Sequence, residues 1–280
     1  MARTYRFVTF LSDYGLEDEF VGVCRGVIKR IAPDVEVLDI SHGIAPQDVQ
    51  AGATVLSQAV AYMPEAVHLA IVDPGVGTKR RALVLRTGSG ALMVGPDNGL
   101  LWQAAEELGG LVGALSIENK ELFLAAPSKT FHGRDIFAPV AAHLALGIGA
   151  EKVGPEIPIE DVVRLELQLA RVDDDHVHAR VVQIDHFGNL QLNAARQELE
   201  GIGVLIGDRI QVRVNGRSFV VPFGQAFSEV ATGRLLVLED SHRWLTLAVN
   251  QGNARERLEA RRGDPVILAR LQVEGDGRAG

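Results

Sequence analysis

The chain has 280 residues, 47% of them hydrophobic, which is enough to bury one large core or two of ordinary size. Its 36 acidic residues outnumber its 28 basic residues, and the net charge of −8 is opposite in sign to the basic surfaces of nucleic-acid binders. This composition excludes a disordered chain and argues against DNA or RNA as a main partner.

The amino-terminal residues and the cysteine content favour a cytoplasmic protein. Residues 1–15 pass from two basic residues straight into a strand-like run, so we expect no signal peptide. No apolar run approaches membrane-spanning length, which predicts no membrane association. The single cysteine, Cys24, allows neither an internal disulfide nor a cysteine-based zinc site, and it suits a reducing compartment.

Short β-rich runs alternate with helical patterns in the first half of the chain. Strands are expected over Phe7–Leu11, Val35–Ile40 and Val67–Val72. Helices are expected from about Glu19 to Ile31 and from Pro46 towards Tyr62. This alternation predicts an α/β domain with a layered, mostly parallel sheet over residues 1–150.

Two further strand candidates, Ala82–Arg86 and Ala91–Gly95, are separated by the turn-like segment Thr87–Gly90. This spacing predicts a hairpin at the edge of the sheet. The periodicity of Arg134–Leu146 predicts the last helix of the first domain.

A change of pattern follows this helix. Gly154–Pro158 carries two prolines in five residues and does not suit a regular element, so residues 151–168 are predicted to form a linker. Residues 169–275 show alternating apolar runs that predict an all-β domain, either a small barrel or a sandwich. The expected strands are Val177–Ile184, Arg209–Val214, Ser218–Val221, Leu235–Leu238 and Leu245–Val249, with Asn215-Gly216 as a hairpin turn.

Polar residues follow the ends of the predicted parallel strands, where ligands bind in such sheets. The segments concerned are Ser12–Gly15, Ser41–Gly43, Asp73–Gly77 and Gly95–Gly99. Each segment by itself is compatible with an ordinary turn. Together, however, they place Asp13, Asp73 and Asp97 on one rim, and carboxylates gathered in this way cost free energy unless a ligand or cation offsets their charge.

A histidine and two arginines accompany these carboxylates. His132 opens a helix with Gly133 beside it, which fits either a backbone-bonded terminal residue or a functional imidazole. Arg80 and Arg81 precede a strand. No G-x-G-x-x-G, Walker, G-x-S-x-G or H-E-x-x-H motif occurs, which removes the dinucleotide, P-loop, α/β-hydrolase and zincin classes by motif.

Six motifs occur in order along nearly the whole chain: Thr9–Gly15, Val72–Gly77, Gly95–Gly99, Phe131–Asp135, Asp185–Asn189 and Ala248–Asn250. On these motifs the chain resembles the S-adenosyl-L-methionine hydroxide adenosyltransferases, which are relatives of the fluorinase and chlorinase enzymes. The resemblance implies an α/β amino-terminal domain and a β-barrel carboxyl-terminal domain. It also implies a homotrimer whose active sites lie between the amino-terminal domain of one subunit and the barrel of the next.

The resemblance implies an enzyme that hydrolyses S-adenosyl-L-methionine to adenosine and L-methionine, with no metal and no cofactor. The family's hydrolytic residues correspond to Asp73, Arg80 and His132 of this chain, with Arg81 as the adjacent alternative to Arg80. The corresponding substrate contacts are Asp13 for the ribose hydroxyls, Asp185 for the methionine ammonium, Asn189 for the adenine and Ser241 for the methionine carboxylate.

The chain departs from the fluorinase at two positions. Where the fluorinase has a serine–arginine pair, this chain has Ser241-His242, which bears on recognition of the methionine carboxylate. Where the fluorinase has a tyrosine, this chain has Asp73, which bears on the nucleophile. The fluorinase also has an extra loop that this chain lacks. Water is therefore favoured over halide as the nucleophile, with a halogenase as the alternative. A non-catalytic adenosine or S-adenosyl-L-methionine sensor is a second alternative, which would keep the substrate contacts but would not need the hydrolytic residues.

Overall fold

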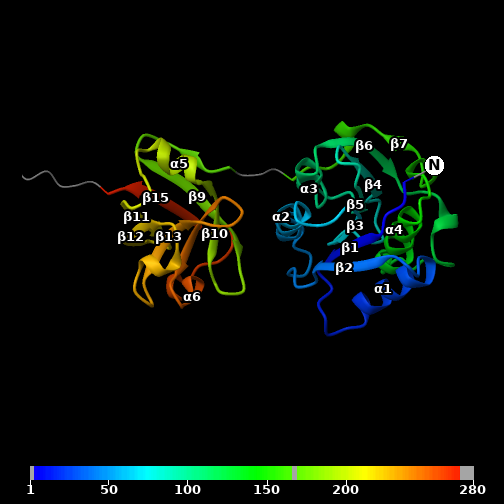
Figure 1. Cartoon of the computed structure of the whole chain (residues 1–280), viewed down its shortest axis with the longest axis horizontal. Helices are drawn as coiled ribbons and strands as arrows, with labels where there is room; N and C mark the ends of the chain where they lie inside the picture. Colours follow the sequence, from blue (N-terminus) through cyan, green and yellow to red (C-terminus); the bar gives the residue numbers. More distant parts are fainter. Residues whose placement is uncertain (1–2, 166–168, 272–280) are drawn as a thin grey trace, which may run out of the picture. The chain divides into compact units, whose positions relative to one another are not determined.

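The computed structural model describes residues 3–165 and 169–271, and the chain divides into two compact units, Met1–Glu166 and Leu167–Gly280 (Figure 1). The division falls within the segment 151–168 that was expected to be a linker. Part of this segment nevertheless packs on the first unit, where Val162 is buried in the core. The expectation that Gly154–Pro158 lies outside regular structure was wrong, because Glu156–Ile157 pairs with the sheet as a short strand.

The described part of the first unit contains a seven-stranded mixed sheet in the order β2-β1-β3-β5-β4-β6-β7. Its strands are β1 (Phe7–Ser12), β2 (Glu36–Ser41), β3 (Ala66–Ile71), β4 (Ala82–Thr87), β5 (Leu92–Pro96), β6 (Leu111–Ser116) and β7 (Glu156–Ile157). Strands β2, β1, β3 and β5 run parallel, which confirms the predicted parallel arrangement. Strand β6 was not predicted from the sequence.

The predicted hairpin of β4 and β5 forms, but it lies inside the sheet and not at its edge. Strand β4 pairs antiparallel with β5 on one side and with β6 on the other. Its side chains explain this position, because Val84 enters the core on one face while Leu83 and Leu85 enter the core on the other. A strand that is apolar on both faces suits the interior of a layered sheet.

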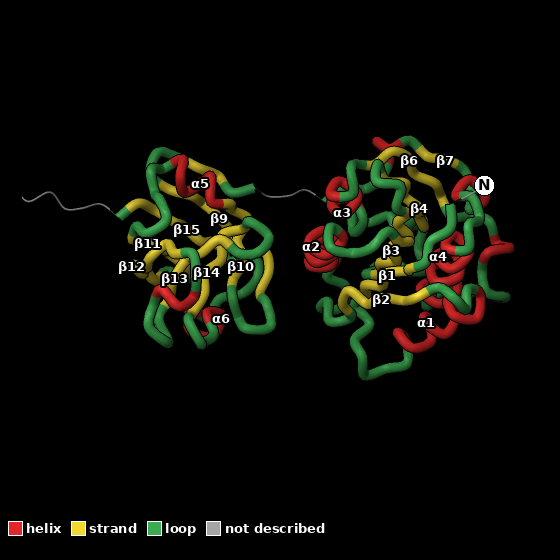
Figure 2. Tube along the Cα trace, viewed as in Figure 1, coloured by secondary structure: helices red, strands yellow, loops and turns green. Residues whose placement is uncertain are grey.

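Helices cover both faces of this sheet and make a three-layer unit (Figures 1 and 2). The helices are α1 (Phe20–Ile31), α2 (Val49–Val60), α3 (Trp102–Glu107) and α4 (Ala138–Ala145). Helices α1 and α4 share one hydrophobic core, and α2 and α3 share the other. Strand β3 supplies both cores in alternation, with Leu69 and Ile71 on the first and Ala70 on the second.

Two helix boundaries differ from the sequence prediction for local reasons. Helix α2 begins at Val49 and not near Pro46, because the Asp48 side chain accepts a hydrogen bond from the Ala51 amide and caps the helix there. The last helix begins as a π-helical turn, Gly133–Phe137, before α4 continues. Helix α3 was not predicted.

The second unit is a barrel and not a sandwich. Its elements are β8 (Arg171–Val172), β9 (His176–Ile184), β10 (Leu190–Ala195), α5 (Arg196–Gly201), β11 (Arg209–Val214), β12 (Arg217–Gly224), β13 (Leu235–Glu239), β14 (Trp244–Val249), α6 (Ala254–Leu258) and β15 (Pro265–Arg270). Pairing runs β9-β10-β14-β13-β12-β11-β15 and returns to β9, which closes the sheet. Strands β10 and β15, missed in the sequence, complete the closure. The predicted turn at Asn215-Gly216 is confirmed by positive φ angles of 49° and 71°.

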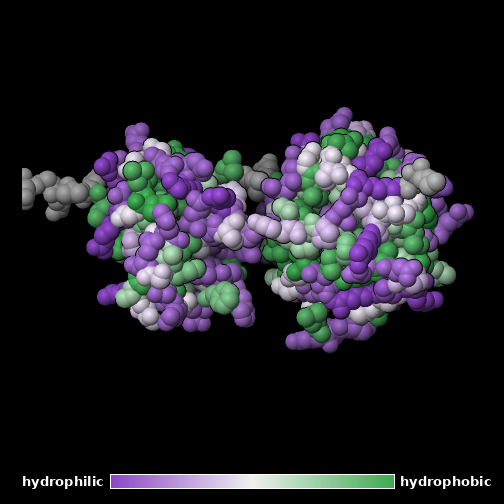
Figure 3. Space-filling view, viewed as in Figure 1, coloured by the Kyte–Doolittle hydropathy of each residue, from purple (hydrophilic) through white to green (hydrophobic). Residues whose placement is uncertain are grey.

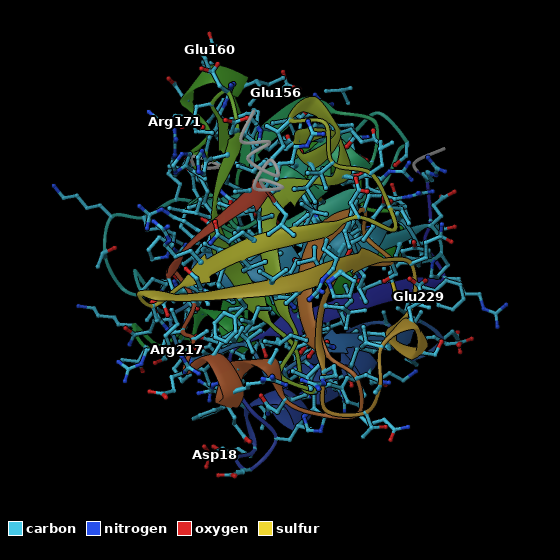
Figure 4. All side chains as sticks on the ribbon, turned by 90° about the vertical axis from the view of Figure 1, so that its left-hand side faces the viewer. Asp18, Glu156, Glu160, Arg171, Arg217 and Glu229 are labelled. Carbon is cyan, nitrogen blue, oxygen red and sulfur yellow. The ribbon has the colours of Figure 1, made fainter. Side chains whose placement is uncertain are left out.

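Both units expose mainly polar side chains, with apolar residues scattered between them (Figure 3). Asp18 and Glu160 in the first unit and Arg217 in the second are exposed charged residues, and Figure 4 labels their side chains. Within residues 3–165 and 169–271, no helix is long and apolar enough to cross a membrane.

The space around two glycines predicts opposite effects of alanine substitution on stability. A Cβ at Gly95 in β5 would clash with the Ala70 carbonyl oxygen, whereas a Cβ at Gly26 in α1 would meet nothing within 4 Å. We expect Gly95→Ala to lower the free energy of unfolding by about 1–3 kcal/mol. We expect Gly26→Ala to raise it by about 0.5–1 kcal/mol, because alanine favours the helix. Urea denaturation measures both, and equal stability of the two variants would contradict the packing of β5 on β3.

Candidate active site

The carboxyl ends of the parallel strands bring polar residues to one edge of the sheet. Asp13 follows β1, Asp73 lies two residues beyond β3, and Asp97 follows β5. Because β1, β3 and β5 are parallel, the predicted shared rim is confirmed. The antiparallel strand β4 starts at this same edge, since Ala82 pairs with Pro96, and the residues just before β4 therefore join the rim.

Asp73, Arg80 and His132 form one hydrogen-bonded cluster at this edge. The Arg80 guanidinium donates from Nε to Asp73 Oδ1 at 3.1 Å and from Nη2 to Asp73 Oδ2. Its Nη2 also lies 3.3 Å from Nδ1 of His132. The Asp73 and Arg80 side chains are only 6% and 8% exposed, so this ion pair is almost fully withdrawn from water. The structure thus brings together the three residues to which the family resemblance assigned hydrolysis.

Further contacts hold the Arg80 guanidinium in place. Its Nη1 donates to the Arg81 carbonyl oxygen at 3.0 Å, and its Cζ lies 5.3 Å from the ring centroid of Phe137. On the other side of the pair, the Asn98 side-chain amide donates to the Val72 carbonyl at 2.8 Å and fixes the backbone just before Asp73. Sequence reasoning did not assign a role to Asn98, although it belongs to the Gly95–Gly99 motif.

The neighbouring arginine has a different partner. Arg81 donates from Nε to Asp97 Oδ2 at 2.8 Å, and the other oxygen of Asp97 accepts the Val163 amide at 2.9 Å. Asp97 therefore ties the start of β4 to the 159–165 segment. Of the two adjacent arginines, Arg80 is the one that contacts Asp73 and His132.

Burial, and secondarily the positive charge of Arg80, lower the pKa of His132 below the ordinary value for histidine. Asp73 and Asp135 oppose this shift. The imidazole is therefore mainly neutral at pH 7. Because a guanidinium can only donate, its contact with Nδ1 makes that nitrogen the acceptor and places the imidazole proton on Nε2. His132 can then donate from Nε2 to an oxygen atom.

Asp13 lies beside this cluster. Its Oδ2 accepts the backbone amide of Gln47 at 2.7 Å, and Gln47 adopts a positive φ of 65°. Burial raises the pKa of Asp13, and the nearby Asp73 carboxylate raises it further. The Asp73 carboxylate thus disfavours the charged form of Asp13, and of these two residues Asp73 is the one paired with Arg80. A carboxylate in this position can accept hydrogen bonds from both hydroxyls of a vicinal diol.

Tyr14, which follows Asp13, was not assigned a role from the sequence. Its ring packs edge-on against Phe131 at 5.7 Å, and its hydroxyl lies where a Cβ on Gly133 would be. Burial raises the pKa of Tyr14 well above its ordinary value, so its hydroxyl stays protonated. The glycine after His132 is thus explained by the close approach of this phenol.

The remaining predicted contacts lie in the barrel unit. Asp185 accepts the amides of Phe187 and Asn189 on Oδ1, and the Asn189 side chain donates to its Oδ2 at 2.7 Å. These bonds join Asp185 and Asn189 within the loop that leads into β10. Ser241 lies in the turn between β13 and β14, three residues before Trp244, which pairs with Ala195 at the far end of β10. Among the described residues, no hydrogen bond links Ser241 to Asp185 or Asn189.

The turn that contains Ser241 is organised by its neighbour Asp240. Its Oδ1 accepts the amides of His242 and Trp244, and its Oδ2 accepts the Thr246 hydroxyl at 3.0 Å and the Gln191 side-chain amide at 2.7 Å. Asp240 was not assigned a role from the sequence. The part of the chain that the structure describes contains no group of three or more His, Cys, Asp or Glu side chains placed to hold a metal ion.

The fold and the rim define a two-domain protein that joins an α/β unit carrying a buried Asp–Arg–His cluster to a closed β-barrel. Comparison with known proteins identifies the family. Residues 8–154 match the amino-terminal domain of the S-adenosyl-L-methionine hydroxide adenosyltransferases, and residues 179–267 match the carboxyl-terminal domain. The chain belongs to this family.

Individual relatives agree with this assignment. The chain is 46% identical to a protein of Salinispora tropica named (R)-S-adenosyl-L-methionine hydrolase, over 92% of this chain and 95% of that protein. A more distant relative, a fluorinase of Nocardia brasiliensis, is 32% identical over 87% of this chain and 90% of its own. The crystal structure of an uncharacterized conserved protein from Thermotoga maritima superposes with a TM-score of 0.88 at 41% identity, covering 94% of this chain and all of that chain.

Charge removal at the cluster predicts opposite shifts in the pKa of His132. Asp73 raises this pKa and Arg80 lowers it. We therefore expect Asp73→Asn to lower the pKa of His132 and Arg80→Met to raise it, as measured by NMR titration of the imidazole. His143, whose pKa is lowered by burial alone, is the internal control and should not shift. Shifts of the same sign in both variants would contradict the described cluster.

Proposed function

We propose that the protein hydrolyses S-adenosyl-L-methionine, giving adenosine and L-methionine. The observation that carries this proposal is the buried Asp73–Arg80–His132 cluster at the carboxyl edge of the sheet. The name of the 46% identical relative, (R)-S-adenosyl-L-methionine hydrolase, supports the same substrate. We also propose that the enzyme acts in the cytoplasm without a metal or cofactor.

The chemistry needs an oxygen nucleophile in line with the ribose C5′ and the sulfur. The sulfonium makes methionine a neutral leaving group, so positioning of the nucleophile supplies much of the rate. Arg80, beside the bound water, stabilises hydroxide, and the Nε2–H of His132 donates a hydrogen bond to the same oxygen. Asp73 orients Arg80 through two hydrogen bonds.

The fate of the water proton depends on the same cluster. The Nδ1 of His132 is occupied by Arg80, so direct proton uptake by the imidazole requires this 3.3 Å contact to break. In the tautomer with the proton on Nε2, His132 donates a hydrogen bond to the attacking oxygen and does not take up the water proton at that nitrogen. This step balances when the proton leaves to solvent as the oxygen attacks C5′ and the C5′–S bond breaks.

In this proposal the substrate is held by residues of both units. Asp13 accepts hydrogen bonds from the ribose hydroxyls, and Asp185 accepts hydrogen bonds from the methionine ammonium group. Asn189 contacts the adenine, and Ser241 contacts the methionine carboxylate. We propose that a homotrimer assembles these sites, with Asp13 and the cluster from one subunit and the barrel residues from the next.

Halide transfer is the competing function, because a fluorinase is 32% identical to this chain. The Asp73 carboxylate argues against it. A halide ion would bring a full negative charge beside this carboxylate in a site with little exposure to water, whereas water enters neutral and loses its proton only as it attacks C5′.

Product analysis tests the hydrolase directly. Incubation with S-adenosyl-L-methionine in ¹⁸O-water should give adenosine that carries the label at the 5′ oxygen, together with methionine, by mass spectrometry. We expect Asp73→Asn and Arg80→Met each to lower kcat by about 10²–10⁴-fold, because each removes charge stabilisation or orientation at the attacking oxygen.

Arg81→Met is the matched control, because Arg81 pairs with Asp97 and not with the cluster. Its kcat should stay within about tenfold of the unmodified enzyme, which is a smaller loss than we expect for Asp73→Asn or Arg80→Met. An unlabelled product, a 5′-halonucleoside in the presence of halide, or bound substrate that is not cleaved would each contradict the hydrolase.

Subunit mixing tests the shared site. Asp73→Asn removes the amino-terminal half of the site and Asp185→Ala removes the barrel half. If sites form between neighbouring subunits, coexpression of the two inactive variants should restore about a quarter of the unmodified activity, because one interface in four then combines two intact halves. Activity that stays at the level of the separate variants would show that each site is built within one subunit.

A further inference from the structure

The segment Ser41–Gly43 was singled out in the sequence, and the proposed reaction does not use it. The structure places His42 in this segment directly against the loop that carries Asp13. The Ser12 hydroxyl lies 2.7 Å from Nδ1 of His42, and the side chain of Ser12 is fully buried. His42 itself is 5% exposed and packs edge-on against Phe10 at 4.7 Å.

The direction of the Ser12–His42 hydrogen bond follows from the other contacts. The Tyr14 amide donates to Ser12 Oγ at 3.3 Å, and Nε2 of His42 faces the Asp39 carboxylate, which favours a proton on Nε2 and makes Nδ1 the acceptor of the Ser12 hydroxyl. This leaves the imidazole proton on Nε2, which faces Asp39 Oδ1 at 3.1 Å but lies outside hydrogen-bonding geometry. Burial, together with Arg25, lowers the pKa of His42 to about 4, so the ring stays neutral in this arrangement.

Serine, histidine and aspartate in a row suggest a nucleophile, but burial excludes this role for Ser12. Its side chain has no exposed surface and contacts the backbone of its own loop. The contacts of Ser12 therefore hold its loop in place. The third residue, Asp39, is paired with Arg25 at the surface.

His42 also holds the far end of the loop. Its carbonyl oxygen accepts the Gly15 amide at 2.8 Å, while its ring accepts the Ser12 hydroxyl. Asp13 lies between these two attachment points. The same connection between β2 and α2 supplies the Gln47 amide that binds the Asp13 carboxylate at 2.7 Å. One segment therefore fixes the backbone on both sides of Asp13 and one of its oxygens.

We propose that His42 is a positioning residue, which sets the Asp13 carboxylate for the ribose diol through its paired contacts with Ser12 and Gly15. This inference rests on the proposed function, because it concerns the same substrate site. It predicts that loss of the imidazole weakens binding of the adenosyl group while the attack on C5′ is little changed.

The chain contains a matched pair that serves as a control. Thr9 Oγ1 lies 2.8 Å from Nδ1 of His68, both residues are buried, and burial lowers the pKa of His68 to about 4. This pair lies in the middle of β1 and β3, where Thr9 and His68 are directly opposite each other. It shares the chemistry of the Ser12–His42 pair but does not contact the Asp13 loop.

The experiment compares His42→Leu, His42→Asn and His68→Leu by steady-state kinetics, adenosine titration calorimetry and thermal unfolding. We expect His42→Leu to raise the KM for S-adenosyl-L-methionine and the Kd for adenosine by about three- to tenfold, the cost of one lost hydrogen bond, with kcat within about twofold. His42→Asn, whose side-chain oxygen can replace Nδ1 as acceptor, should recover most of the affinity. His68→Leu should lower Tm without changing either constant.

A double-mutant cycle adds a second measure. Ser12→Ala combined with His42→Leu should weaken adenosine binding no more than the stronger single variant, because both remove the same contact. Equal KM for His42→Leu and His68→Leu at matched Tm would overturn the positioning role. Failure of the unmodified protein to cleave or bind S-adenosyl-L-methionine would instead overturn the proposed function, so the two failures are distinguishable.

Discussion

The arrangement of this protein depends on one buried ion pair, between Asp73 and Arg80. Two charges withdrawn from water are costly unless each is well paired, and removal of one partner leaves the other uncompensated. The fold meets this requirement with two hydrogen bonds between the pair and further contacts from Arg81, Phe137 and His132. The guanidinium is therefore held before substrate binds, which suits a site that stabilises charge on an attacking oxygen.

The sheet makes this pair possible. Asp73 follows a parallel strand, but Arg80 precedes an antiparallel one, and the two meet because β4 starts at the edge of the sheet where β3 and β5 end. If the hairpin formed the edge of the sheet, as its turn residues suggested, β4 would lack a partner on one side and Arg80 would lie at the border of the unit. The apolar side chains on both faces of β4 stabilise the interior position.

Polar side chains also hold the loops of the rim in place. His42 holds the Asp13 loop, Asn98 holds the Asp73 loop, and Asp97 holds both Arg81 and the 159–165 segment. In the barrel unit, Asp240 organises the turn that carries Ser241. Asp13 and Ser241 therefore each have a buried or half-buried polar neighbour that orders the backbone around them.

The sequence alone determined the alternation of strands and helices, the position of most β-rich runs and the six motifs, because periodicity and turn residues act over a few neighbouring positions. The family resemblance that these motifs carry implied Asp73, Arg80 and His132 as one group, and the structure joins them. Only the tertiary structure decided that Arg80 and not Arg81 contacts Asp73, that β4 lies inside the sheet, that β10 and β15 close the barrel, and that His42 meets Ser12. Each of these depends on contacts between residues distant in the chain, which local pattern does not specify.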